Sequence, residues 1–151
     1  MLRDDINNAL KDAMKARDER RVSTLRLVNS ALKNADIEAP GQGKGPLGDD
    51  ELLGLLQKMI KQRAESIELF EKGGRAELAA QERQEVAIIA SYLPKQMSED
   101  EVKAAIADAI RDTGAAGMKD MGKVIAALRG KYAGKMDFAK ASALVKGALS
   151  A

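Results

Sequence analysis

Only four aromatic residues, two Tyr and two Phe, occur among the 151 residues of the chain. A hydrophobic core must therefore be built from Leu, Ile, Val, Met and Ala. Most of these residues, together with the abundant Lys, Arg, Glu and Gln, favour helices over strands. A chain of this length buries roughly 70% of the surface that its unfolded state exposes, which is enough for one medium domain or two small ones. The composition thus predicts an all-α fold.

Apolar residues recur at helical spacing in seven segments of the sequence. Asp18 is expected to cap the second helix, and Ser98 and Glu101 are expected to form a capping box at the start of the fifth. Asp137 is expected to cap the seventh helix, and Gly73 with Gly74 to end the third. The expected helices cover residues 2–16, 19–35, 49–72, 76–92, 99–112, 119–129 and 138–149.

Pro94 marks the clearest boundary in the chain, because a proline biases the residue before it away from the helical conformation. We therefore expect an N-terminal four-helix domain in residues 1–93 and a C-terminal three-helix domain in residues 94–151. Residues 37–48 are rich in Gly and Pro and predict a loop. This loop is not expected to bind phosphate, because it lacks the spacing and the terminal Lys-Ser/Thr of a phosphate-binding loop.

The chain contains no Cys and no His, which excludes several kinds of catalytic and metal site. Their absence excludes disulfides and thiolate zinc sites, and it removes the commonest general base and metal ligand. Ser98 is better explained as a helix cap than as a nucleophile. Glu65, Glu68 and Glu71 recur every three residues, but without a histidine they favour a solvated helix face with ion pairs over a metal site. No catalytic residue, metal or cofactor is expected.

No apolar run approaches the roughly 18–20 residues that a membrane span needs. The segment from Met1 to Arg17 contains three Asp residues and lacks the apolar centre of a secretory signal. It is also too acidic for a transit peptide. These features predict a soluble, cytoplasmic protein without a membrane partner.

Positive charge is concentrated near the C-terminus: residues 95–151 carry ten Lys and Arg against seven Asp and Glu. A cluster of this kind can attract a polyanion such as RNA, although a basic solvated face would give the same pattern. Tyr132 lies within the cluster and could stack on a base. The candidate nucleic-acid-binding residues are Lys119, Gly122, Lys123, Arg129, Lys131 and Lys135.

Gly122 is unusual because glycine lowers helix stability by up to about 1 kcal/mol relative to alanine. Two explanations remain open from the sequence. The glycine can allow close approach of a ligand to the backbone, or it can allow close packing of another helix. The preceding Gly114–Gly117 turn leads into the predicted helix with Lys119, and the free amides at a helix N-terminus favour anions.

Four stretches of the sequence resemble the GatB/YqeY family, and the resemblance covers essentially the whole chain. The last two are the most specific to the family. The stretches are Ser23–Arg26, Ile60–Arg63 with Ser66–Glu68, Tyr92–Gln96 and Gly117–Val124.

The resemblance implies a two-part helical fold and kinship with the tail of the glutamyl/aspartyl-tRNA amidotransferase B subunit, which helps to hold tRNA. By this kinship Lys119, Gly122 and Lys123 are expected to contact the tRNA backbone. The chain departs from many relatives at Met136–Lys140, where they carry a small, glycine-containing turn, so contacts in that turn are not carried over.

Three functions follow as hypotheses. The first is a tRNA-binding accessory module, and the second is a helical module that docks on an amidotransferase or synthetase. The third is a carbon–nitrogen ligase that takes its amide nitrogen from glutamine, which the family label suggests. The third is the weakest, because the sequence contains no glutamine-cleaving nucleophile and no nucleotide-binding loop.

Overall fold

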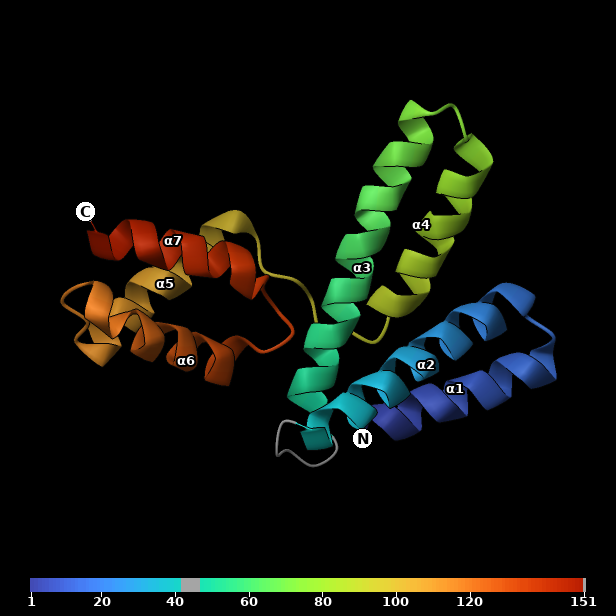
Figure 1. Cartoon of the computed structure of the whole chain (residues 1–151), viewed down its shortest axis with the longest axis horizontal. Coiled ribbons are helices and arrows are strands. Elements are labelled where there is room, and N and C mark those ends of the chain that lie inside the picture. Colours follow the sequence, from blue (N-terminus) through green and yellow to red (C-terminus); the bar gives the residue numbers. More distant parts are fainter. Residues whose placement is uncertain (42–46, 151) are drawn as a thin grey trace. The chain divides into compact units, whose positions relative to one another are not determined.

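The computed structural model describes residues 1–41 and 47–150, and all regular secondary structure in these residues is helical (Figure 1). The expectation of an all-α fold with four helices followed by three is confirmed. The chain divides into two compact units, Met1–Leu93 and Pro94–Ala151. The helices are α1 (Leu2–Ala16), α2 (Glu19–Gly41), α3 (Asp49–Lys72), α4 (Ala76–Ala90), α5 (Glu99–Thr113), the 3₁₀ turn η1 (Met118–Asp120), α6 (Met121–Tyr132) and α7 (Phe138–Ser150).

The N-terminal unit is built from two helical hairpins, α1–α2 and α3–α4 (Figure 1). Each hairpin turns where the sequence provides a suitable cap. The Asp18 carboxylate accepts the amide of Arg21 at 3.1 Å, as expected for an N-cap, and Gly74 has φ +73° at the end of α3. The shared core is aliphatic and consists of Ile6, Ala13, Leu25, Val28, Leu32, Leu52, Leu56, Met59 and Ile89.

Helix α2 extends further than its sequence suggests, because a tertiary contact holds its last turns. The Arg3 guanidinium donates to both carboxylate oxygens of Asp36, with N···O distances of 2.6 and 2.5 Å. Arg3 also donates to the Leu47 carbonyl at 3.1 Å, and the Leu47 amide donates to Asp36 at 3.3 Å. These bonds join α1, α2 and the approach to α3. The expected loop in residues 37–48 is therefore wrong over residues 37–41, which are helical, and its segment 42–46 lies outside the described residues.

A second ion pair joins α3 and α4 in the interior of the N-terminal unit. The Arg63 Nε donates to the Glu85 carboxylate at 3.1 Å, and the two side chains are only 15% and 10% exposed. At the surface of α3, Lys72 pairs with Glu68 at 3.0 Å, which confirms the ion-pair interpretation for that part of the acidic helix face.

The C-terminal unit packs α5, α6 and α7 around a separate aliphatic core. The capping box before α5 is confirmed: the Ser98 hydroxyl accepts the Glu101 amide at 3.1 Å, and the Glu101 carboxylate accepts the Ser98 amide at 3.0 Å. Asp137 accepts the amide of Ala139 at 2.9 Å and so caps α7, as expected. The core residues are Ala105, Ile106, Ala109, Val124, Leu128, Met136, Ala141 and Val145.

Two helix ends differ from the sequence expectation by a few residues. Helix α4 ends at Ala90 and not at Tyr92, because the amides of Tyr92 and Leu93 bond to carbonyls three residues back and tighten the chain before Pro94. Helix α6 is preceded by a 3₁₀ turn and continues to Tyr132.

We predict that Glu85→Ala lowers the free energy of unfolding by about 3 kcal/mol, because it leaves the largely buried Arg63 without a counter-charge. Urea denaturation followed by circular dichroism measures the loss. The control is the double variant Arg63→Met/Glu85→Leu, which removes both charges and is expected to recover most of the stability. Equal unfolding energies for Glu85→Ala and the parent protein would contradict the role assigned to this ion pair.

A pH dependence is expected at Asp36, whose pKa is lowered chiefly by the hydrogen bonds from Arg3. Because the folded state holds this carboxylate ionised, its contribution is complete above the pKa of the unfolded state. The contribution is lost as the pH falls through the lower pKa of the folded state, below about pH 4. The melting temperature of Asp36→Asn should therefore lie below that of the parent at pH 7, and the difference should shrink toward pH 2. A constant difference across this range would contradict the assignment.

Candidate nucleic-acid interface

Helix α6 presents one side to the core and the other to solvent. Val124 and Leu128 are completely or almost completely buried against α5 and α7. The remaining positions of the opposite side, including Gly122, Lys123 and Arg129, are exposed. Val124 and Leu128 are four residues apart and share the buried face, so Gly122, Lys123 and Arg129 lie outside that face and are open to water.

The turn that leads into α6 is stabilised by a hydrogen bond to the Asp120 carboxylate. Gly117 is extended, and the residues of η1 follow it. The Asp120 carboxylate accepts the amide of Ala116 at 2.9 Å. This bond is the main reason that the pKa of Asp120 is lowered, and Lys123 and Lys119 lower it further. The Ala116 amide is therefore already bonded to Asp120 and is not free to bind a phosphate.

Lys119 and Lys123 lie on either side of Asp120 in the sequence, and both ammonium groups act on its carboxylate. Both side chains are exposed. They give this end of α6 two cations against one anion, with their charged groups open to a ligand.

Gly122 lies in open space. A Cβ atom added at this position would have no heavy atom of another residue within 4 Å, apart from its neighbours in the chain and the backbone of its own helix. Close packing of another helix among the described residues therefore does not explain the glycine. Approach of a ligand or of a partner's helix to the backbone remains compatible with the structure.

Arg129 and Lys131 point to different sides of α6. Lys131 follows Gly122 by nine residues, which is two and a half helical turns, so the two positions lie on opposite sides. The Arg129 guanidinium lies 5.6 Å from the centroid of the Phe138 ring, and the Lys131 ammonium lies 5.6 Å from that of Tyr132. Lys131 thus lies on the side of α6 opposite Gly122 and Arg129.

Lys135 belongs to the loop after α6, which is hydrogen-bonded to the Pro94–Met97 segment. The Gln96 side-chain amide donates to the carbonyls of Pro94 at 2.9 Å and Gly134 at 2.7 Å. The Met97 amide donates to the Lys135 carbonyl at 2.9 Å. Gly134 has φ +76°, a conformation that favours glycine. These bonds fix the loop that carries Lys135.

A shallow hollow opens beside this loop and adds a residue that the charge analysis missed. Its lining includes Lys95 and Lys135 together with Tyr132. Lys95 also acts on the Glu101 carboxylate, whose pKa is lowered mainly by its bonds with Ser98. Lys95 belongs to the stretch Tyr92–Gln96, which carries part of the family resemblance. That stretch was the sequence signal that could have identified Lys95 as a candidate binding residue. Of the six predicted residues, Lys119 lies in η1, Gly122, Lys123 and Arg129 lie on α6, and Lys135 lies at the loop, whereas Lys131 lies on α6 away from Gly122 and does not line the hollow.

In the described part of the chain, no helix has the length and apolar character required to cross a membrane. Among the same residues, no group of three or more acidic side chains is arranged to hold a metal ion.

Several fungal proteins are similar in sequence to this chain. The Altered inheritance of mitochondria protein 41, mitochondrial, of Lachancea thermotolerans is 36% identical over 110 residues, which are 72% of this chain and 57% of that protein. The protein of the same name from Saccharomyces cerevisiae is 38% identical over 85 residues, or 56% of this chain and 44% of that protein. An uncharacterized protein of Schizosaccharomyces pombe is 33% identical over 94 residues, or 62% of this chain and 72% of that protein. The chain thus spans about half the length of the two mitochondrial relatives.

These relatives contradict the expectation of a cytoplasmic protein, because two of the three are mitochondrial by name. The expectation rested on the acidic composition of the segment from Met1 to Arg17. That segment folds as α1, with Ile6 and Ala13 in the core. Its composition therefore reflects the requirements of an amphipathic helix and carries no information about the compartment.

The family assignment rests on nearly the full chain. The sequence profile described as Yqey-like protein matches residues 3–149, which include both units and all four stretches that carry the resemblance. The chain belongs to the YqeY-like protein family.

Proposed function

We propose that the C-terminal unit binds tRNA through the exposed side of α6, with Lys119 and Lys123 contacting backbone phosphates. The observation that carries the proposal is the combination of these two exposed lysines with an exposed glycine between them. Phosphate contacts from lysine require neither a deep pocket nor a catalytic group, which fits the open surface of α6.

Arg129 extends the same side of α6 by about two turns and supplies a third cation. Its position over the Phe138 ring limits the freedom of the guanidinium, so less conformational entropy is lost when it binds a phosphate. Lys95, Lys135 and Tyr132 form a second group, where a base could stack on the tyrosine ring. Kinship with the tail of the tRNA amidotransferase B subunit supports tRNA as the RNA that is bound.

Fluorescence anisotropy of labelled tRNA, at about 50 and 200 mM salt, tests the proposal. We expect saturable binding that is tighter than binding to duplex DNA and that falls steeply with salt, because phosphate contacts release counterions. The variant Lys119→Glu/Lys123→Glu should bind about a hundred-fold more weakly at the lower salt. Replacing both lysines by the neutral Gln should reduce the slope of log affinity against log salt concentration by about 2, because two phosphate contacts are lost.

The matched control is Lys58→Glu/Lys103→Glu, which changes net charge equally at exposed lysines on α3 and α5. It should retain most of the affinity. Equal loss of affinity in both double variants would show a general charge effect and contradict the site at α6. No binding of tRNA by the folded parent protein at low salt would contradict the function itself.

The variant Gly122→Ala is expected to change stability and tRNA affinity in opposite directions, so the two effects can be distinguished. Because Gly122 contacts nothing, alanine should raise the free energy of unfolding by up to about 1 kcal/mol. If the tRNA backbone approaches Gly122, the same variant should bind tRNA several-fold more weakly. Gly147→Ala on α7 is the control, since a Cβ there also meets nothing, and it should leave tRNA affinity unchanged. Unchanged tRNA affinity in Gly122→Ala would exclude backbone approach at this residue.

A further inference from the structure

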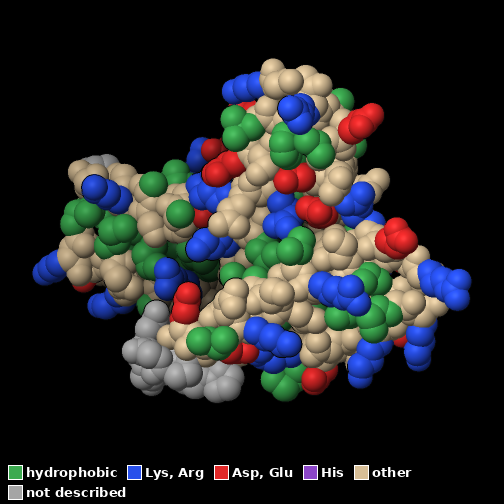
Figure 2. Space-filling view, turned by 45° about the vertical axis from the view of Figure 1, so that its right-hand side comes forward, with side chains coloured by type: hydrophobic (Ala, Val, Ile, Leu, Met, Phe, Trp, Pro, Cys, Tyr) green, Lys and Arg blue, Asp and Glu red, His purple; other side chains and the backbone are tan. Residues whose placement is uncertain are grey.

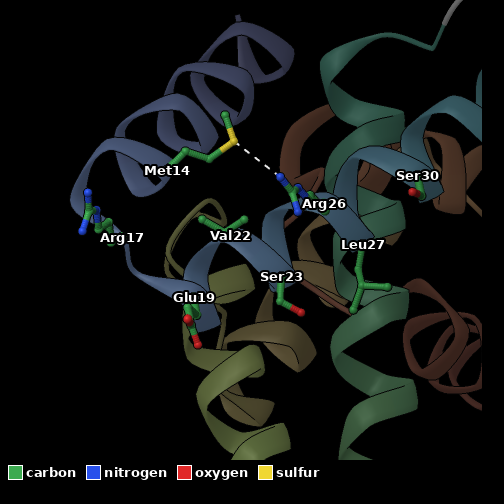
Figure 3. A pocket seen from close by; sticks show the side chains of 8 residues that line it. All are labelled: Met14, Arg17, Glu19, Val22, Ser23, Arg26, Leu27 and Ser30. Carbon is green, nitrogen blue, oxygen red and sulfur yellow. Dashed lines mark hydrogen bonds between the residues drawn. The ribbon is translucent and has the colours of Figure 1, made fainter.

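The N-terminal unit has an open hollow between the end of α1 and the first half of α2, far along the sequence from the residues of the proposed tRNA site. Figure 3 shows Met14 extending from α1 toward Arg26 on α2, with Ser23 and Leu27 along α2. Met14 and Leu27 are each 46% exposed, although both are large apolar side chains. Val22 is half-buried between them. The hollow therefore has an apolar lining that the described part of the chain leaves in contact with water.

The motif Ser23–Arg26, which contributes to the family resemblance, divides between core and hollow. Thr24 and Leu25 are fully buried, and the Thr24 hydroxyl donates to the Arg20 carbonyl at 2.9 Å. Ser23 and Arg26 instead line the hollow. Core packing explains the two middle residues of the motif and leaves the two outer ones without a structural role.

The described lining of the hollow contains two cations, Arg17 and Arg26, and one carboxylate, Glu19. The Arg26 guanidinium donates to the Met14 sulfur at 3.6 Å, a weak acceptor, and forms no ion pair within the described residues. The end of Figure 2 at the right, where the α1–α2 turn lies, shows Lys and Arg side chains with hydrophobic side chains between them. Residues 15–26 contain five cations against two carboxylates: Lys15, Arg17, Arg20, Arg21 and Arg26 against Asp18 and Glu19.

Asp18 caps α2 through the amide of Arg21 and keeps its negative charge, but it is not in the described lining of the hollow. Glu19 lines the hollow and is the only acidic side chain in its described lining. The charge of the surface therefore favours an acidic partner, while the lining favours apolar anchors.

Arg17 ends α1 and also lines the hollow. It adopts φ 58° at the end of α1, and it is the one non-glycine residue with positive φ in the described chain. Glycine is the usual residue at this position, because a Cβ makes the left-handed conformation unfavourable. Arginine at this position lowers the conformational stability of the turn relative to glycine, and it places a cation at the edge of the hollow.

We propose that this hollow is a docking site for an acidic amphipathic helix of another protein. Glu19, Ser23, Leu27 and Ser30 follow one another along α2 at spacings of four and three residues, so they form one uncovered stripe about three turns long. A helix laid along this stripe would insert apolar side chains between Met14, Val22 and Leu27, and place carboxylates near Arg17 and Arg26. Methionine suits such a surface, because its flexible side chain adapts to different apolar shapes.

RNA is a poorer occupant of this hollow, although the surrounding charge would attract it. The described lining contains no aromatic ring on which a base could stack, and it includes the apolar side chains of Met14, Val22 and Leu27. A protein helix uses both the apolar lining and the cations, whereas RNA would use only the cations.

Selection from a phage library of random 16-residue peptides tests the proposal, with the immobilised full-length chain as target. Counter-selection uses the variant Arg26→Glu/Leu27→Glu, whose two substitutions are at exposed positions. We expect enrichment of net acidic peptides with apolar residues at helical spacing. Synthetic copies should bind the parent saturably and bind the double variant at least ten-fold more weakly.

The matched control is Lys33→Glu/Leu69→Glu, which makes the same kinds of substitution at exposed positions on α2 and α3, outside the hollow. It should bind the selected peptides like the parent. Arg17→Gly should raise the melting temperature and yet weaken peptide binding several-fold, an opposite pair of effects that loss of folding cannot produce.

Three results would overturn the proposal. One is a selection without enrichment, or with enriched peptides that are not acidic. Another is equal peptide affinity for the parent and the Arg26→Glu/Leu27→Glu variant. The third is binding of a single-stranded RNA oligonucleotide in place of the peptide, with the same loss in the double variant, which would assign the surface to nucleic acid. Because no residue of the proposed tRNA site is changed, failure here leaves that proposal standing, and the reverse also holds.

Discussion

Each helix of this protein can bury only a narrow aliphatic stripe, and this constraint governs both units. No aromatic side chain is among the fully buried residues of the described chain, where the cores consist of Ile, Leu, Val, Met and Ala. Such side chains fill space between closely spaced helices but do not reach around them. The side of each helix that faces away from its core therefore stays in water, and polar or charged residues are free to occupy it.

The two candidate binding surfaces are consequences of this arrangement, and they differ in chemistry. On α6, burial of Val124 and Leu128 leaves Lys123, Arg129 and the exposed Gly122 in contact with water. On α2, burial of Leu25 and Val28 leaves a stripe that includes the exposed Leu27 beside Arg26. Cations with an open backbone suit phosphate, whereas cations around an apolar lining suit an acidic helix.

Much of the α6 surface was predictable from the sequence, because exposure along a helix follows from its apolar period. The exposure of Lys119, Gly122 and Lys123 follows in this way. The period of the helix also places Lys131 on the side opposite Gly122. Lys131 was nevertheless predicted as a binding residue, because it was chosen for its charge and not for its position around the helix. Lys95 was missed because it approaches Lys135 only when the chain before α5 meets the loop after α6, a contact between residues about forty positions apart. The bond from the Ala116 amide to the Asp120 carboxylate spans only four residues, but it closes the turn before α6 and does not follow a regular helix-cap pattern.

The sequence by itself determined the helical class, the positions of most helices and the caps at Asp18, Ser98 and Asp137, because these features depend on residues within about four positions of one another. Only the tertiary structure decided where α2 ends, since Arg3 and Asp36 are 33 residues apart, and how α3 and α4 are joined, since Arg63 and Glu85 are 22 apart. It also decided that Met14 and Leu27 share one hollow. Local hydrogen bonds can be inferred from neighbouring residue types, whereas contacts between distant segments depend on how whole helices pack.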